Sequence, residues 1–184
     1  MTAMTAFKSS LPIAALSFLL AGPALAVGGG SSSPPATTPT TDCPAGEVWD
    51  QTRGSCVPIQ QGALEDDVLY EAVRELAYAG RLDDAALALT AMSDQGDDRV
   101  LNYRGFIARQ QGDFATARRY YDAAIAANPD NLLARSYLGM GLVERYQLAA
   151  AREQLQEILD RGGEGSWPHL ALAEAIESGQ TTRY

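Results

Sequence analysis

The chain has 184 residues with 23 acidic and 14 basic side chains, which gives a net charge of −9 at pH 7. An acidic surface repels phosphate backbones, so the composition argues against nucleic acid as a partner, and no basic run is present for an anionic membrane. The sequence has no glycine-rich phosphate loop that leads from a strand into a helix, and no readable pairing of a nucleophile with a base. We therefore expect no enzymatic activity and no cofactor.

The first 26 residues have the pattern of a secretory signal. Lys8 gives a positive start, Leu11–Leu20 is an apolar run, and Ala24–Ala26 is a small-x-small cleavage site. The run is short and contains a proline, which argues against a membrane-spanning helix. We expect a secreted or periplasmic protein with no membrane span after cleavage. The remaining 13 arginines and 23 acidic residues would give it a net charge of −10.

Residues 27–41 consist mainly of glycine, serine, proline and threonine. A segment of this composition cannot bury enough apolar surface to offset the entropy lost on ordering. We predict a disordered linker, which would form a solvated tail at the start of the mature chain.

Residues 42–60 form a small segment that contains the only two cysteines, Cys43 and Cys56. In an exported protein, such a pair is predicted to form one disulfide. In the loop-closure model, a loop of this size removes roughly 3 kcal/mol of entropy from the denatured chain.

The motif Cys-Pro-x-Gly-x-Val-Trp-Asp, followed by Gly-Ser-Cys-Val-Pro, is similar to the hairpin half of peritrophin-type chitin-binding modules. The similarity covers only this short motif, and the other cysteines of the module are absent. It implies that Trp49 stacks on a sugar ring, because an exposed indole offers an apolar face beside a hydrogen-bond donor. The alternative is that Trp49 covers the disulfide or packs on the first helix pair.

The second half of the chain repeats itself after a shift of 34 residues. Gly105 and Ala117 then fall on Gly139 and Ala151. Apolar residues in the segment Phe114–Ile125 recur at steps of three and four, which predicts a helix with one apolar stripe. The period predicts a helix-turn-helix array.

Turn signals separate the expected helices. Gly112 suits the left-handed residue that ends one helix, and Asp113 can cap the next. In Asn128–Asn131 the proline stops the second helix, and Asp or Asn can start another. The pattern predicts antiparallel helix pairs, with Gly105 at the helix crossing and Ala117 opposite it.

This unit resembles the tetratricopeptide repeat. The strongest copy spans residues 98–131, where the matching positions are Gly105, Gly112, Phe114, Ala117, Tyr121, Ala124 and Pro129. A copy at 66–97 has Val73 at the small crossing position, and a copy at 132–165 has Tyr146 in place of the turn glycine.

Residues 167–178 resemble the helix that caps such arrays. The resemblance therefore predicts an all-α solenoid over residues 64–180. It would contain about three antiparallel helix pairs and a C-terminal capping helix, preceded by the small disulfide loop.

The first helix of each repeat lines a concave groove in this family, which implies a protein or peptide partner. Carried over to this sequence, the groove positions are Tyr70, Arg74, Tyr78, Asn102, Phe106, Arg109, Gln110, Ser136, Met140, Val143 and Glu144. The positive charges of Arg74 and Arg109 favour an acidic peptide. Arginine and tyrosine are also common hot-spot residues of interfaces. Alternatively, these arginines pair with neighbouring carboxylates such as Glu71 and Glu75.

The leading hypothesis is a non-enzymatic scaffold of the bacterial cell envelope that binds a protein or peptide in this groove. The alternative is carbohydrate or cell-wall binding through the Cys43–Cys56 loop, with the repeats as a spacer. The single histidine, His169, is expected to pack at the start of the last helix, because one histidine without a free cysteine makes no metal site.

Overall fold

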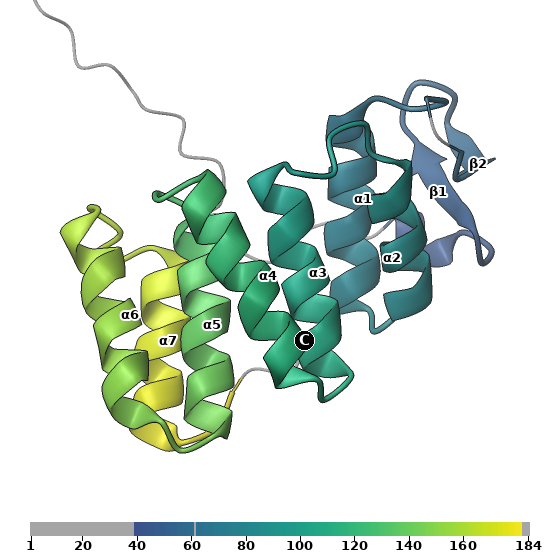
Figure 1. The fold of residues 1–184 in the computed structure, drawn as a ribbon. Helices are drawn as coiled ribbons and strands as arrows, with labels where there is room; N and C mark the ends of the chain where they lie inside the picture. The colour runs from purple at the N-terminus through teal and green to yellow at the C-terminus, as the bar shows by residue number, and fades with distance from the viewer. Residues whose placement is uncertain (1–38, 61, 182–184) are drawn as a thin grey trace, which may run out of the picture.

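A computed structural model of the chain describes residues 39–60 and 62–181 (Figure 1). The predicted signal segment and residues 27–38 of the predicted linker lie outside the described residues. Within the described ranges, no helix has the length and apolar composition needed to cross a membrane. The elements in chain order are η1 (Pro39–Asp42), β1 (Glu47–Asp50), β2 (Ser55–Pro58), α1 (Asp66–Tyr78), α2 (Leu82–Ala91), α3 (Asp98–Gln110), α4 (Phe114–Ala127), α5 (Leu132–Glu144), α6 (Leu148–Asp160) and α7 (Trp167–Ser178).

The helices stack as consecutive antiparallel pairs, α1 with α2, α3 with α4 and α5 with α6 (Figure 1). One layer is continuous, because α1 contacts α3, α3 contacts α5 and α5 contacts α7. The last helix also packs on α6 and so closes the end of the array. This arrangement confirms the predicted all-α solenoid of about three helix pairs with a C-terminal capping helix.

The turn between the two helices of each pair has one repeated geometry. Gly80 and Gly112 have φ values of 76° and 84°, and Tyr146 has φ 59° at the corresponding position of the third pair. After each of these residues, a backbone N–H donates to a carbonyl of the last helical turn at 2.9 Å. The third repeat therefore keeps the same left-handed turn although Tyr146 replaces the glycine.

Small residues in the first helix of a pair make room for large ones on a neighbour. A Cβ added at Gly105 would lie 2.6 Å from Tyr121 Cε1. At the equivalent Gly139, the nearest atoms belong to Leu172 of α7. The side chain nearest to Gly105 is thus Tyr121, one turn along α4 from Ala117, which is also fully buried.

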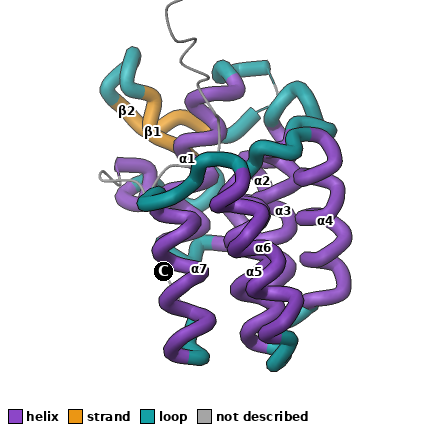
Figure 2. The backbone as a smooth tube through the Cα atoms, turned by 90° about the vertical axis from the view of Figure 1, so that its left-hand side faces the viewer, coloured by secondary structure: helices purple, strands orange, loops and turns teal. Residues whose placement is uncertain are grey.

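The segment that contains the cysteines folds as a β-hairpin. Strands β1 and β2 are antiparallel, with Trp49 opposite Cys56. Cys43 and Cys56 form a disulfide, which confirms the predicted pairing. Figure 1 shows the hairpin at the end of the molecule opposite α6 and α7, and the turned view in Figure 2 also has it next to α1.

Residues 39–41 differ from the sequence-based expectation. We expected them to belong to a disordered linker, but they lie in η1, where Thr40 is buried. Thr40 N donates a 2.8 Å hydrogen bond to Glu75 Oε2 of α1. This hydrogen bond to α1 orders the segment. A contact between residues so far apart in the sequence cannot be predicted from local composition.

Arg81, between α1 and α2, holds the hairpin against the first helix pair. Its guanidinium donates to the carbonyl oxygens of Thr41 at 3.1 Å, Cys43 at 2.8 Å and Pro44 at 3.2 Å. Asp84 completes the contact, since it pairs with Arg81 at 2.6 Å and accepts from Gly46 N at 2.8 Å. The hairpin is therefore the N-terminal cap of the solenoid.

Candidate functional site

The residues predicted to line a groove lie on α1, α3 and α5, the continuous layer of the solenoid. We call the surface formed by these residues the inner face; its members are Tyr70, Arg74, Tyr78, Asn102, Phe106, Arg109, Gln110, Ser136, Met140, Val143 and Glu144. Gln110 is exposed, whereas Phe106 and Met140 are fully buried in the full-length chain. Equivalent positions follow one another from repeat to repeat, as the resemblance predicted.

Aromatic rings form a chain of contacts from α1 to α7. Tyr70 and Tyr103 have ring centroids 5.8 Å apart, Phe106 and Tyr137 5.2 Å, and Tyr137 and Trp167 6.1 Å. Tyr103 and Trp167 were not among the predicted groove residues. The sequence signals for these two residues were their positions: Tyr103 follows Asn102, and Trp167 begins the capping helix.

A hydroxyl contact joins two repeats that are not adjacent. Tyr78 Oη of α1 lies 2.5 Å from Tyr137 Oη of α5, although these residues are 59 positions apart. Burial raises the pKa of the neighbouring Tyr103 well above its ordinary value. The Tyr103 phenol thus acts as a neutral hydrogen-bonding group, and its hydroxyl lies 3.4 Å from Tyr78 Oη.

Both inner-face arginines pair with carboxylates of this chain. Arg74 Nη1 lies 2.7 Å from Glu71 Oε2, and its side chain is 9% exposed. Arg109 Nη1 lies 2.6 Å from Glu144 Oε1, and its side chain is 3% exposed. Of the two alternatives left open by the sequence, the geometry favours internal pairing. The inner face therefore carries little uncompensated positive charge for an acidic ligand.

Among the described residues, two neutral side-chain atoms of the inner face are buried without a hydrogen-bond partner. Asn102 Oδ1 and Ser136 Oγ are both buried, and their residues are 1% and 0% exposed. They lie 34 positions apart, at equivalent sites of consecutive repeats. A buried polar atom without a partner costs about 1–3 kcal/mol, so both atoms would gain from a hydrogen-bonding ligand group that displaced the side chains covering them.

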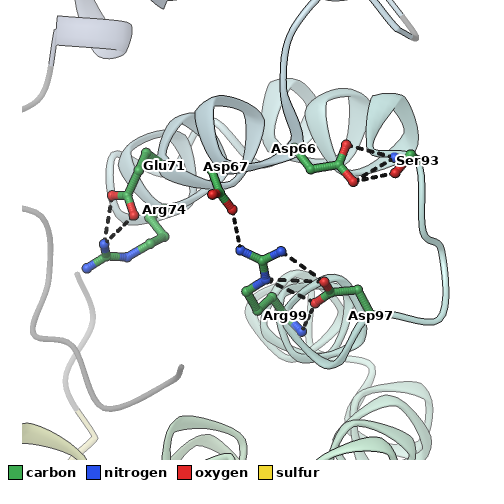
Figure 3. A network of polar contacts seen from close by, with 7 residues as sticks. All are labelled: Asp66, Asp67, Glu71, Arg74, Ser93, Asp97 and Arg99. Atoms are coloured by element: carbon green, nitrogen blue, oxygen red, sulfur yellow. Dashed lines mark hydrogen bonds and ion pairs between the residues drawn. The ribbon is translucent and has the colours of Figure 1, made fainter. Parts of the chain in front are cut away.

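A network of ion pairs joins the first two repeats (Figure 3). Arg99 of α3 pairs with Asp67 of α1 at 2.8 Å and with its own helix cap, Asp97, at 2.9 Å. Burial raises the pKa of Asp97, but the hydrogen bonds from Arg99 outweigh this and hold it below the ordinary value. Asp66 accepts from Ser93 N at 2.9 Å and from its hydroxyl. The network fixes how α1 sits on α3.

Trp49 of β1 is partly exposed and lines a pocket of about 300 Å³ between the hairpin and α1. Its backbone N–H points to Thr40 Oγ1 at 3.4 Å. The indole and α1 line the same pocket. The wall opposite the hairpin is formed by α1 and includes Asp67, Glu71 and Glu75.

The described residues contain no group of three or more His, Cys, Asp or Glu side chains arranged to hold a metal ion. His169 Nδ1 accepts a hydrogen bond from Gly165 N at 3.1 Å, which places it at the start of α7. This geometry gives His169 a capping contact.

Comparison with known proteins relates one segment of the chain to a family. No curated protein and no solved structure matches the chain. The family model of the tetratricopeptide repeat matches residues 98–131, which contain α3 and α4. This match, together with the stacked helix pairs, supports a relationship to tetratricopeptide repeat proteins, whose repeats generally mediate interactions between proteins.

Proposed function

We propose that this protein is a non-enzymatic scaffold that holds a segment of another protein on its inner face. The observation that carries the proposal is the pair of buried, unpartnered atoms, Asn102 Oδ1 and Ser136 Oγ. A polypeptide backbone offers N–H and C=O groups at regular intervals, so one extended segment satisfies an acceptor on α3 and a hydroxyl on α5 once the side chains that cover these two atoms have moved aside.

The chemistry of the inner face selects the bound segment. Phe106 and Met140 lie on the same helices and are fully buried, so they add no charge to the inner face. Arg74 and Arg109 are neutralised by Glu71 and Glu144. An extended segment without net negative charge therefore fits better than the acidic peptide that Arg74 and Arg109 favour in the sequence.

The proposal includes export to the bacterial cell envelope. Its support is the signal-like pattern of residues 1–26 and the disulfide between Cys43 and Cys56, since disulfides persist in oxidising compartments. Cell fractionation, with mass measurement after thiol blocking, tests this part. A cytosolic protein with two free thiols would contradict it.

Site-specific photocross-linking tests the binding face in the chain that begins at Val27 and in the full chain. A photoreactive residue at Gln110, an exposed member of the inner face, should cross-link to a partner in extracts of the producing cells. The same residue at Arg118, an exposed position on α4, should give no such product. Equal cross-linking from both sites, or from Arg118 alone, would refute binding on the inner face.

Ser136→Ala provides the matched functional variant. It removes a hydroxyl that has no partner, so the melting temperature should stay the same or rise, because an unpaired buried polar group is destabilising. Partner affinity should fall roughly 3- to 10-fold, the worth of one hydrogen bond. Unchanged affinity for the cross-linked partner would remove the observation on which the proposal rests.

A further inference from the structure

The pocket between the cap and the solenoid is a second surface, separate from the paired positions of α3 and α5. We call it the hairpin pocket; it has a volume of about 300 Å³ and lies between β1, the turn that follows it, and α1. Trp49 comes from the hairpin, and Val68 and Ala72 come from the helix. These groups give the pocket an aromatic side and an apolar floor.

The helix also contributes one row of negative charge. Asp67, Glu71 and Glu75 follow one another at intervals of four residues, so they lie on the same side of α1 and repel one another. No arginine, lysine or histidine of the described chain lines the pocket. The cations that pair with the row, Arg74 and Arg99, do not line it either.

Glu75 lies at the buried end of the row, where burial and neighbouring charge change the pKa of its carboxyl. Glu75 is 6% exposed and accepts a 2.8 Å hydrogen bond from Thr40 N. Burial raises the pKa of its carboxyl, and the nearby Glu71 raises it further. A positive group placed in the pocket would stabilise both carboxylates.

We propose that the hairpin pocket binds a basic side chain, arginine or lysine, of a protein partner. The cationic head would lie between the indole face of Trp49 and the carboxylates of Glu71 and Glu75, and its methylene stem would pack on Val68 and Ala72. Cation–π attraction and charge complementarity then act on the same group. A neutral sugar would use the indole but would gain no charge attraction from Glu71 and Glu75.

The experiment follows the two indole N–H signals in ¹H–¹⁵N spectra of the chain that begins at Val27, assigned with Trp49→Phe and Trp167→Phe. The probes are two capped pentapeptides that differ only in a central arginine or glutamine, and a trimer of N-acetylglucosamine. The arginine peptide should shift the Trp49 signal in a saturable manner and leave the Trp167 signal in place. The glutamine peptide should produce at least a fivefold weaker response.

Glu71→Gln should weaken binding of the arginine peptide at least fivefold, whereas Glu153→Gln, the same charge change at an exposed site of α6, should leave it unchanged. Equal responses to the two peptides, or equal effects of the two variants, would overturn the proposal. A shift of the Trp49 signal caused by the sugar alone would replace it with carbohydrate binding. Ser136→Ala should not affect this readout, so failure here and failure of binding on the inner face are distinguishable.

Discussion

Arg109 of α3 and Glu144 of α5 form an ion pair across the boundary between two repeats, with 2.6 Å between Nη1 and Oε1. The arginine side chain is 3% exposed and the glutamate side chain 37%. The guanidinium carbon also lies 5.8 Å from the ring centroid of Phe106. Arg109 is thus a structural link between repeats.

The first prediction follows from this burial. Arg109→Ala should lower the free energy of unfolding by about 2–4 kcal/mol, less than for a fully buried pair because Glu144 keeps access to water. Arg118→Ala is the control, since its 3.6 Å pair with Asp122 is more than half exposed at both ends. It should change stability by less than about 0.5 kcal/mol. Urea unfolding measures both, and equal losses would contradict the structural role.

Sequence reasoning succeeded where the determinants are local. The segment predicted as the capping helix, residues 167–178, coincides with α7. Ser166 precedes the helix, Pro168 lies in its first turn, and Gly179 follows it with φ 71°. Such signals act within a few residues, so they can be read without the tertiary structure.

The remaining features depend on which surfaces meet. Arg109 and Glu144 were both assigned to the inner face, but their pairing depends on the distance between α3 and α5. The contact of Thr40 with Glu75 joins segments 35 positions apart. The period of a repeat fixes neither distance, because helix packing angles vary with the side chains at each crossing.

The second prediction concerns the crossing of α3 and α4. Gly105→Ala would put a Cβ 2.6 Å from the Tyr121 ring, which is itself fully buried. Overpacking of this kind costs about 1–3 kcal/mol, so the melting temperature should fall. Gln110→Ala, on the exposed side of the same helix, should have little effect. Two equal melting temperatures would mean that Tyr121 can move aside.

The third prediction is a pH effect at Glu75. Burial raises the pKa of this carboxyl in the folded protein above its ordinary value, so the folded state binds more protons just above that value and stability falls as pH rises through the folded pKa. Glu75→Gln removes this dependence. The stability of the variant relative to wild type should therefore increase from about pH 4 to pH 7.

Chemical unfolding at a series of pH values measures this difference. Glu153→Gln on α6 reports the effect of the net charge alone. A difference between Glu75→Gln and wild type that falls with rising pH would show that the hydrogen bond from Thr40 outweighs the burial of the carboxyl.

The fourth prediction concerns Arg81, whose planar guanidinium contacts four carbonyl oxygens of the cap and pairs with Asp84. Arg81→Lys keeps the charge but cannot reproduce this set of directed bonds. We expect a loss of about 1–2 kcal/mol in the docking of the hairpin. Hydrogen exchange should increase in residues 39–60 and change little in α5–α7. Unchanged exchange in the hairpin would show that the disulfide and the Gly46–Asp84 bond are sufficient to hold it.

The fifth prediction concerns Tyr146, which occupies the left-handed turn position with φ 59° and is 91% exposed. A side chain in this conformation costs roughly 1–2 kcal/mol, part of which glycine gives back through its greater freedom in the unfolded chain. Tyr146→Gly should therefore stabilise the protein by about 0.5–1 kcal/mol, because almost no buried surface is lost. Tyr146→Ala keeps the strain without the ring and serves as the control, with stability near that of wild type. A lower melting temperature for Tyr146→Gly would contradict the prediction and show that the exposed ring stabilises the folded state. If it raises the melting temperature and weakens partner binding, the tyrosine is a contact residue retained at a cost in stability.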